Sequence, residues 1–297
     1  MTRALVVLVG ILWGCNWPAG KLALGEITPW TFRLLGLVLG TAALAGLALM
    51  RGARITLPRG RAAWHLTVAG LLNIAGFNLF AAFAQLGAAT SRVAVIAYTM
   101  PIWAALFSWL ALGDRLSWPK LLGLGLGAAG LAALILPFLG AGIPIGMLYA
   151  LGAAVTWAAG TVYVKWAGLT GDPINLTFWQ FAVGTVAVAA GLVLFEPAPH
   201  LWPLHWPALL GAAYNVVFGM TLAYVVWFEI VGRLTPTTAS LGILLAPVIG
   251  VLGSLALLGD RPMPADIVGF LLVLAAAACA LLLPDRRPGA GTSGGTR

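Results

Sequence analysis

Charged residues divide this chain into long apolar stretches. Nine stretches contain no Asp, Glu, Lys or Arg: 4–20, 34–50, 62–91, 93–113, 121–164, 173–195, 197–228, 234–259 and 267–284. A helix that crosses the hydrocarbon of a bilayer needs about 20 mostly apolar residues. The fifth stretch would span roughly 66 Å as one helix, which is enough for two crossings, and the segment from Pro137 to Pro144 supplies a break. The pattern therefore predicts an all-α integral membrane protein with ten transmembrane helices.

The composition supports a membrane protein and excludes a water-soluble one. Hydrophobic residues make up 61% of the chain and charged residues 8%, with a mean hydropathy of +1.01, whereas soluble domains carry roughly 25% charged residues. The net charge is +8, but the basic residues are spread between apolar stretches and form no patch. They therefore indicate orientation in a membrane and not a nucleic-acid partner.

The distribution of Lys and Arg predicts the topology. With the N-terminus in the cytoplasm, all but four of the 16 basic residues fall on the cytoplasmic side, as the positive-inside rule requires. We therefore expect a multi-pass protein of a bacterial inner membrane with both termini in the cytoplasm. The first apolar stretch is read as an uncleaved first helix and not as a signal peptide, because no small-residue cleavage site follows it. The Gly-, Ser- and Pro-bearing segment 285–297 is expected to be a disordered cytoplasmic tail.

The sequence repeats itself at a shift of 146 residues, which predicts two domains, 1–139 and 140–284. The matching positions are Thr31-Phe32 with Thr177-Phe178, Pro101 with Pro247, Gly113-Asp114-Arg115 with Gly259-Asp260-Arg261, and, after a two-residue adjustment, Trp13 and Lys21 with Trp157 and Lys165. Each half holds five helices, so the second half enters the membrane upside down. The charges agree, because segment 50–61 carries four arginines and its counterpart 196–207 carries no Lys or Arg. These are the features of inverted-topology repeats.

Several of these motifs together resemble a known family. Trp13-Gly14 is followed by Asn16 and Trp17 in the first helix, and a proline-bearing fourth helix ends in Gly113-Asp114-Arg115. Together with the duplication, these features over residues 4–284 resemble the drug/metabolite transporter superfamily, its EamA-type permeases, and among those most the aromatic amino-acid exporters of the YddG type. The resemblance implies a basket of ten helices around a central cavity lined by helices one, three, four, six, eight and nine. It does not fix the substrate, because these permeases export amino acids, other metabolites, cations and drugs.

Polar and aromatic residues deep within the apolar helices are the candidates for a substrate site, since an unpaired polar group in hydrocarbon is costly. They are Trp13, Asn16, Trp17 and Lys21 in the first helix, Asn73, Phe77 and Asn78 in the third, Tyr98 in the fourth, Trp157 and Tyr163 in the sixth, Tyr214, Asn215 and Phe218 in the eighth, and Ser240 in the ninth. The alternative is packing between helices for the aromatic residues and interhelical hydrogen bonds for the asparagines. Similarly, Asp114-Arg115 and Asp260-Arg261 are either helix-end caps or a gate that opens and closes.

The sequence favours transport over catalysis. It contains no nucleophile–base motif, phosphate-binding loop or zinc motif, so we expect no enzyme activity, cofactor or metal. A channel is a rival, but inverted duplication with 38 glycines suits moving helix bundles better. No Asp or Glu lies in the middle of a predicted span, which argues against proton coupling.

The expected function is export of small amphipathic metabolites, above all aromatic or other neutral amino acids, by alternating access. In this interpretation Lys21 accepts the substrate's carboxylate from the edge of the cavity. Lipophilic or quaternary cations are the alternative substrates, because aromatic side chains bind them through cation–π contacts, and a non-transport membrane component is a further alternative. The expected partners are a small molecule and the lipid bilayer, with a monomer as the expected assembly.

Overall fold

Ten helical segments, several of them broken, make up the computed structural model of this chain. It describes residues 2–114, 116–196, 203–233 and 236–282, with no description of the side chains of 2–3, 231–243 and 280–282. In chain order the elements are α1 (Thr2–Ala23), α2 (Pro29–Met50), α3 (Gly60–Gly70), the π-helical η1 (Leu71–Gly76), α4 (Phe77–Gly87), α5 (Thr90–Ala97), α6 (Met100–Leu112), α7 (Trp118–Ile135), the 3-10 turn η2 (Leu136–Phe138), α8 (Ile145–Trp166), α9 (Pro173–Phe195), α10 (Trp206–Tyr214), the π-helical η3 (Asn215–Leu222), α11 (Ala223–Arg233), α12 (Pro236–Leu258) and α13 (Pro264–Leu282).

These elements confirm the predicted all-α membrane fold. Eight helices in the described part of the chain are long and apolar enough to cross a membrane, and two shorter apolar helices, Leu244–Leu258 and Pro264–Cys279, belong to α12 and α13. The long apolar stretch 121–164 is divided as predicted, since α7 ends at Ile135 and α8 begins at Ile145. The predicted tail, 285–297, lies outside the described residues.

Local sequence explains where the helices begin and end. Pro29, Pro173 and Pro264 are the first residues of α2, α9 and α13, where the missing N–H costs nothing. Gly113 and Gly259 both follow the last residue of a helix with φ of 68°, a left-handed conformation that glycine adopts without strain. These are the glycines of the repeated Gly-Asp-Arg motif, so the two halves end equivalent helices in the same way.

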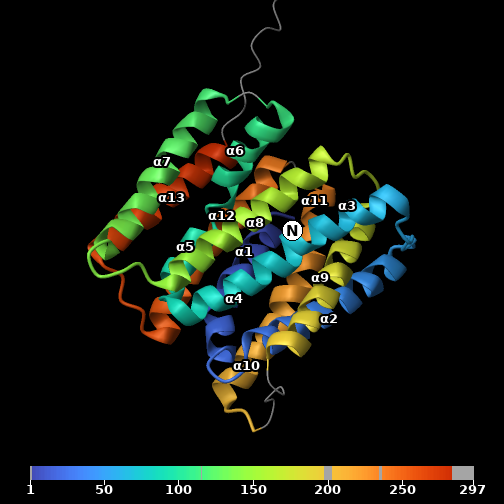
Figure 1. Cartoon of the computed structure of the whole chain (residues 1–297), viewed down its shortest axis with the longest axis horizontal. Coiled ribbons are helices and arrows are strands. Elements are labelled where there is room, and N and C mark those ends of the chain that lie inside the picture. The colour runs from blue at the N-terminus through green and yellow to red at the C-terminus, as the bar shows by residue number, and fades with distance from the viewer. Residues whose placement is uncertain (1, 115, 197–202, 234–235, 283–297) are drawn as a thin grey trace, which may run out of the picture.

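The two halves also pack in equivalent ways. α7 and α13, the fifth and tenth crossings, lie side by side along one edge, and α2 and α9, the second and seventh, pack together at the opposite edge (Figure 1). Between these edges α1 packs against α12, and α8 packs against α5 and α6. The first crossing thus contacts the ninth while the sixth contacts the fourth, as exchange of the two halves requires.

A π-helical stretch interrupts the third crossing at η1 and the eighth at η3. The two stretches lie at equivalent positions of the repeat, since a shift of 146 carries 71–76 onto 217–222 within η3. The wider turn leaves backbone groups out of the regular helical ladder and is frequent at functional sites. Neither stretch was predicted, because their sequences contain no proline and nothing else that marks a break in the helix.

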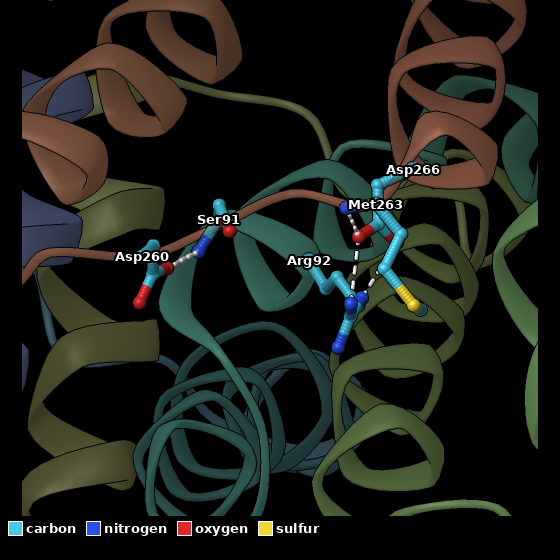
Figure 2. A network of polar contacts seen from close by, with 5 residues as sticks. All are labelled: Ser91, Arg92, Asp260, Met263 and Asp266. Carbon is cyan, nitrogen blue, oxygen red and sulfur yellow. Dashed lines mark hydrogen bonds and ion pairs between the residues drawn. The ribbon is translucent and has the colours of Figure 1, made fainter.

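A buried ion pair joins the two halves at the start of α13 (Figure 2). The Arg92 guanidinium donates to both carboxylate oxygens of Asp266 at 2.6 Å, and Asp266 also accepts the backbone N–H of Met263 at 2.7 Å. Only 1% of the Asp266 side chain and 13% of the Arg92 side chain are exposed. Arg92 further lies 4.9 Å from the centre of the Phe138 ring. This paired and hydrogen-bonded arrangement satisfies two charges in an apolar surrounding.

We expect Asp266→Asn to lower the free energy of unfolding by about 3–5 kcal/mol, because it leaves Arg92 buried without an anion. Denaturation of the purified protein in detergent measures this. The matched control is Glu229→Gln, whose partner Arg51 is about a third exposed and whose loss should cost at most about 1 kcal/mol. Equal stability of Asp266→Asn and the wild type would show that the buried pair does not hold the halves together.

Candidate functional site

The first and eighth crossings are joined by a hydrogen bond between two predicted site residues. Asn215 Nδ2, at the start of η3, donates to Asn16 Oδ1 of α1 at 2.9 Å. Asn215 is 1% exposed, and its Oδ1 has no hydrogen-bond partner in the described structure. Glycines allow this approach: a Cβ at Gly219 would overlap the Asn16 amide, and a Cβ at Gly36 would come within 2.8 Å of Asn215 Oδ1.

A second set of polar contacts lies where η1 of the third crossing meets the sixth and seventh crossings. Asn73 Nδ2 donates to Gln180 Oε1 of α9 at 2.9 Å, and Thr161 of α8 donates its hydroxyl to Asn73 Oδ1 at 3.4 Å. A Cβ at Gly160 would overlap the Asn73 side chain. In the internal repeat, helix three corresponds to helix eight, helix six to helix one, and helix seven to helix two. The two amide clusters therefore occupy equivalent places in the repeat, although their residues are not identical.

Two aromatic groups lie beside the Asn16–Asn215 pair. Trp17 meets Tyr98 edge-on with 6.2 Å between ring centres, and both side chains are buried. Trp13 lies 5.9 Å from Tyr224 and 5.5 Å from Trp227, again between ring centres. α1 thus directs one indole toward the fourth crossing and the other toward the eighth.

Other predicted residues occupy different surroundings. Phe77 and Trp157 pack against the core cluster that contains Tyr98. The Asn78 side-chain amide donates to the carbonyl of Ile74, one turn earlier in the same crossing, at 2.9 Å. This hydrogen bond therefore does not link two crossings. Tyr214 donates its hydroxyl to the carbonyl of Leu12 at 3.3 Å.

The remaining predicted residues make no hydrogen bond to the amide pairs in the part of the chain whose side chains are described. Phe218 contacts Tyr214 and is 40% exposed. Tyr163 is near the end of α8, where its hydroxyl lies 2.7 Å from His65 Nδ1. The His65 side chain is buried against Tyr163. Ser240 belongs to α12, but its side chain lies outside the described residues.

Lys21 lines a cleft of about 610 Å³ between the ends of several helices. The cleft is bordered by Lys21 of α1, Thr90 at the start of α5 and Asp260 after α12, together with the apolar side chains of Leu22, Leu86 and Leu258. The Lys21 ammonium donates to the backbone carbonyl of Gln85. At the other end of the repeat, Lys165 lies 3.4 Å from Asp114 Oδ2.

Acidic side chains in the described part of the chain lie at helix ends or in loops. Glu196, which follows α9, accepts the backbone N–H of Trp30 at 3.0 Å and both the N–H and the hydroxyl of Thr31. These donors belong to the first turn of α2, whose positive dipole end favours an anion. Asp172 similarly accepts the N–H of Asn175 at 2.9 Å in the first turn of α9. These contacts give the two carboxylates structural partners.

The prediction from sequence missed three residues that now belong to the candidate site. Gln180 carries the Asn73 bond, and its only sequence signal is an amide within an apolar stretch. Thr90 borders the cleft as a residue that sequence does not distinguish from other helix-start threonines. Asp260 was identified only as a cap or gate, because its distance from Lys21 along the chain gives no sign that both border one cleft.

The chain matches the EamA-like transporter family over residues 2–136 and again over 144–282. This protein belongs to that family. It is 30% identical over 284 residues to the transporter YvbV of Bacillus subtilis, covering 94% of this chain and 90% of that one. It is also 26% identical over 291 residues to a probable amino-acid metabolite efflux pump of Salmonella typhimurium, covering 91% of each chain. A crystal structure with 23% identity shares the fold with a TM-score of 0.63, over 94% of this chain and 96% of the other.

We expect Gly219→Ala to destabilise this EamA-family protein by about 1–3 kcal/mol, the cost of over-packing a tight contact. The added methyl group pushes the Asn16 amide away from Asn215. Gly46→Ala is the control, because a Cβ there meets nothing within 4 Å and alanine is the better helix former. Thermal denaturation in detergent compares the two variants. If Gly219→Ala were as stable as Gly46→Ala, the close approach of α1 and η3 would not depend on that glycine.

Proposed function

We propose that this EamA-family transporter exports aromatic or other neutral amino acids across the bacterial inner membrane by alternating access. The observation that carries the proposal is the chemistry of the described membrane interior. Neutral amides and aromatic rings from both halves meet there, while the described acidic residues stay at helix ends. A zwitterion with a large apolar side chain matches such surroundings, because amides bind its polar groups and rings contact its side chain.

The name of one relative supports the same substrate class. That relative is a probable amino-acid metabolite efflux pump, and the match covers 91% of each chain. The distribution of Lys and Arg along the sequence supports an orientation with both termini in the cytoplasm. The protein acts in this proposal as a monomer without a cofactor and catalyses no chemical reaction.

Two amide junctions link the halves, and each involves a residue of a π-helical stretch. Asn16–Asn215 links the first and eighth crossings, and Asn73–Gln180 links the third and seventh. A substrate that binds between the halves exchanges these protein–protein hydrogen bonds for bonds to itself. The unpaired Asn215 Oδ1 provides an acceptor for the substrate's ammonium group. Relative motion of the halves then exposes the same groups to the opposite side.

Flux of labelled tryptophan into liposomes that hold only this protein tests the proposal. We expect saturable flux, and we expect Asn16→Leu to reduce it by about tenfold, the effect of losing roughly 1.4 kcal/mol of binding. Thr67→Val is the matched control, because this hydroxyl bonds the carbonyl of Ala63 in its own helix. Flux of a lipophilic cation without tryptophan flux would favour the alternative, for which the Trp13–Tyr224–Trp227 rings would be the cation–π site. Absence of any flux would favour a non-transport role.

Transport is proposed to follow the substrate's own gradient without proton exchange. Proton-coupled carriers keep an ionisable residue within the membrane, and the described acids instead pair with helix starts, Arg, Lys or His. We therefore expect that a pH gradient imposed on the liposomes leaves the final internal tryptophan concentration equal to the external one. Accumulation above the external concentration, abolished by an ionophore, would contradict this prediction.

A further inference from the structure

The cleft beside Lys21 carries groups of opposite charge that do not pair with each other in the described structure. Lys21 donates to the Gln85 carbonyl, and Asp260 Oδ2 accepts the backbone N–H of Ser91 at 2.8 Å (Figure 2). An ammonium has three donors and a carboxylate about four acceptor positions. Each group therefore keeps capacity for a ligand. The volume of about 610 Å³ lies within the roughly 300–1,000 Å³ that small-molecule sites occupy.

Two unpaired polar atoms belong to a residue that lines the cleft and to the residue whose carbonyl binds Lys21. The Thr90 hydroxyl oxygen and Gln85 Oε1 are buried and have no hydrogen-bond partner in the part of the chain that the structure describes. Thr90 and Gln85 are 0% and 1% exposed. Buried polar groups are normally paired, and those left over call for a partner such as a ligand. Thr90 borders the cleft, and Gln85 supplies the carbonyl that holds Lys21.

The inverted repeat shows what the same two positions do at the other end. Lys165 and Asp114 are the repeat counterparts of Lys21 and Asp260, and they form an ion pair of 3.4 Å. The glycine before each aspartate has φ of 68°, and the aspartate N–H bonds a serine carbonyl at 3.3 Å in both halves. The backbone conformation at the two aspartates is therefore the same. Lys165 and Asp114 form an ion pair, whereas Lys21 and Asp260 border a cleft.

We propose that the Lys21–Asp260 cleft is a peripheral binding site for zwitterions, separate from the amide junctions between the halves. The Lys21 ammonium binds the ligand's carboxylate, and Asp260 binds its ammonium. Leu22, Leu86 and Leu258 contact its apolar side chain. When this end closes, Lys21 and Asp260 pair with each other, as Lys165 and Asp114 do, and the ligand is released. The inference rests on the proposed function for the class of ligand.

Three labelled ligands separate the contributions of the two charges. Tryptophan carries both groups, tryptophanamide lacks the carboxylate, and indole-3-propionate lacks the ammonium. Equilibrium binding and flux are measured for each ligand with purified wild-type protein in liposomes, and with Lys21→Gln and Asp260→Asn. Asparagine keeps an oxygen acceptor for the Ser91 N–H, so this variant removes the charge and retains a helix cap. Arg54→Gln, an exposed arginine in the loop between α2 and α3, is the control.

We expect Lys21→Gln to weaken tryptophan binding by about tenfold or more and to leave tryptophanamide binding unchanged. Asp260→Asn should weaken tryptophan binding similarly and leave indole-3-propionate binding unchanged. Lys21→Arg, which keeps the charge, should restore most of the tryptophan affinity and also guards against a folding defect in Lys21→Gln.

The outcomes distinguish this inference from the proposed function. Unchanged tryptophan affinity in Lys21→Gln and Asp260→Asn, with wild-type flux intact, would overturn the cleft site and leave the amino-acid exporter standing. Equal weakening of all three ligands in both variants would also overturn it, because that result indicates a structural role for the charges. A wild-type protein that neither binds nor moves any amino acid would overturn both.

Discussion

The absence of water in the bilayer is the constraint on which this structure depends. Every polar group that enters the hydrocarbon must find a partner inside the protein. The backbone meets this requirement by forming helices, and most charges meet it by staying near helix ends. Arg92 and Asp266 lie near the starts of α5 and α13, and they are bound to each other by two short hydrogen bonds. The amides of Asn16 and Asn215 meet it by pairing between the first and eighth crossings.

Glycine makes these interhelical amide bonds geometrically feasible. In a membrane, helices gain little from the hydrophobic effect against each other, so close packing of small residues and hydrogen bonds hold them together. Gly219 and Gly160 leave the space that the Asn16 and Asn73 side chains fill. Both glycines come from the second half, and each lies opposite an amide of the first half. The same packing solution thus serves both junctions, with the amide on the first crossing in one and on the third crossing in the other.

The internal duplication gives the molecule two chemically similar ends in different states. Lys165 and Asp114 are paired, whereas Lys21 and Asp260 border a cleft. In the proposed transport cycle, exchanging the open and closed ends would replace each set of contacts with a similar one, because the contacts of the two halves are equivalent. The two states of that cycle would then differ little in free energy, and a substrate would shift the balance between them through modest differences in affinity.

The sequence alone determined the ten helices, because the spacing of charges and the length needed to cross hydrocarbon leave few alternatives. It also singled out Asn16, Asn215 and Lys21, since polar residues are rare in such helices. Only the tertiary structure decided what each of them contacts. Asn78 and Asn16 are both amides within apolar helices, yet Asn78 bonds its own helix and Asn16 bonds another. Helical periodicity fixes which residues share a face, but the partner depends on how each helix is rotated and what packs against it. The same reason applies to Asp260 and Lys21, which are far apart in the chain. That both border one cleft follows only from the tertiary structure, which brings their helix ends together.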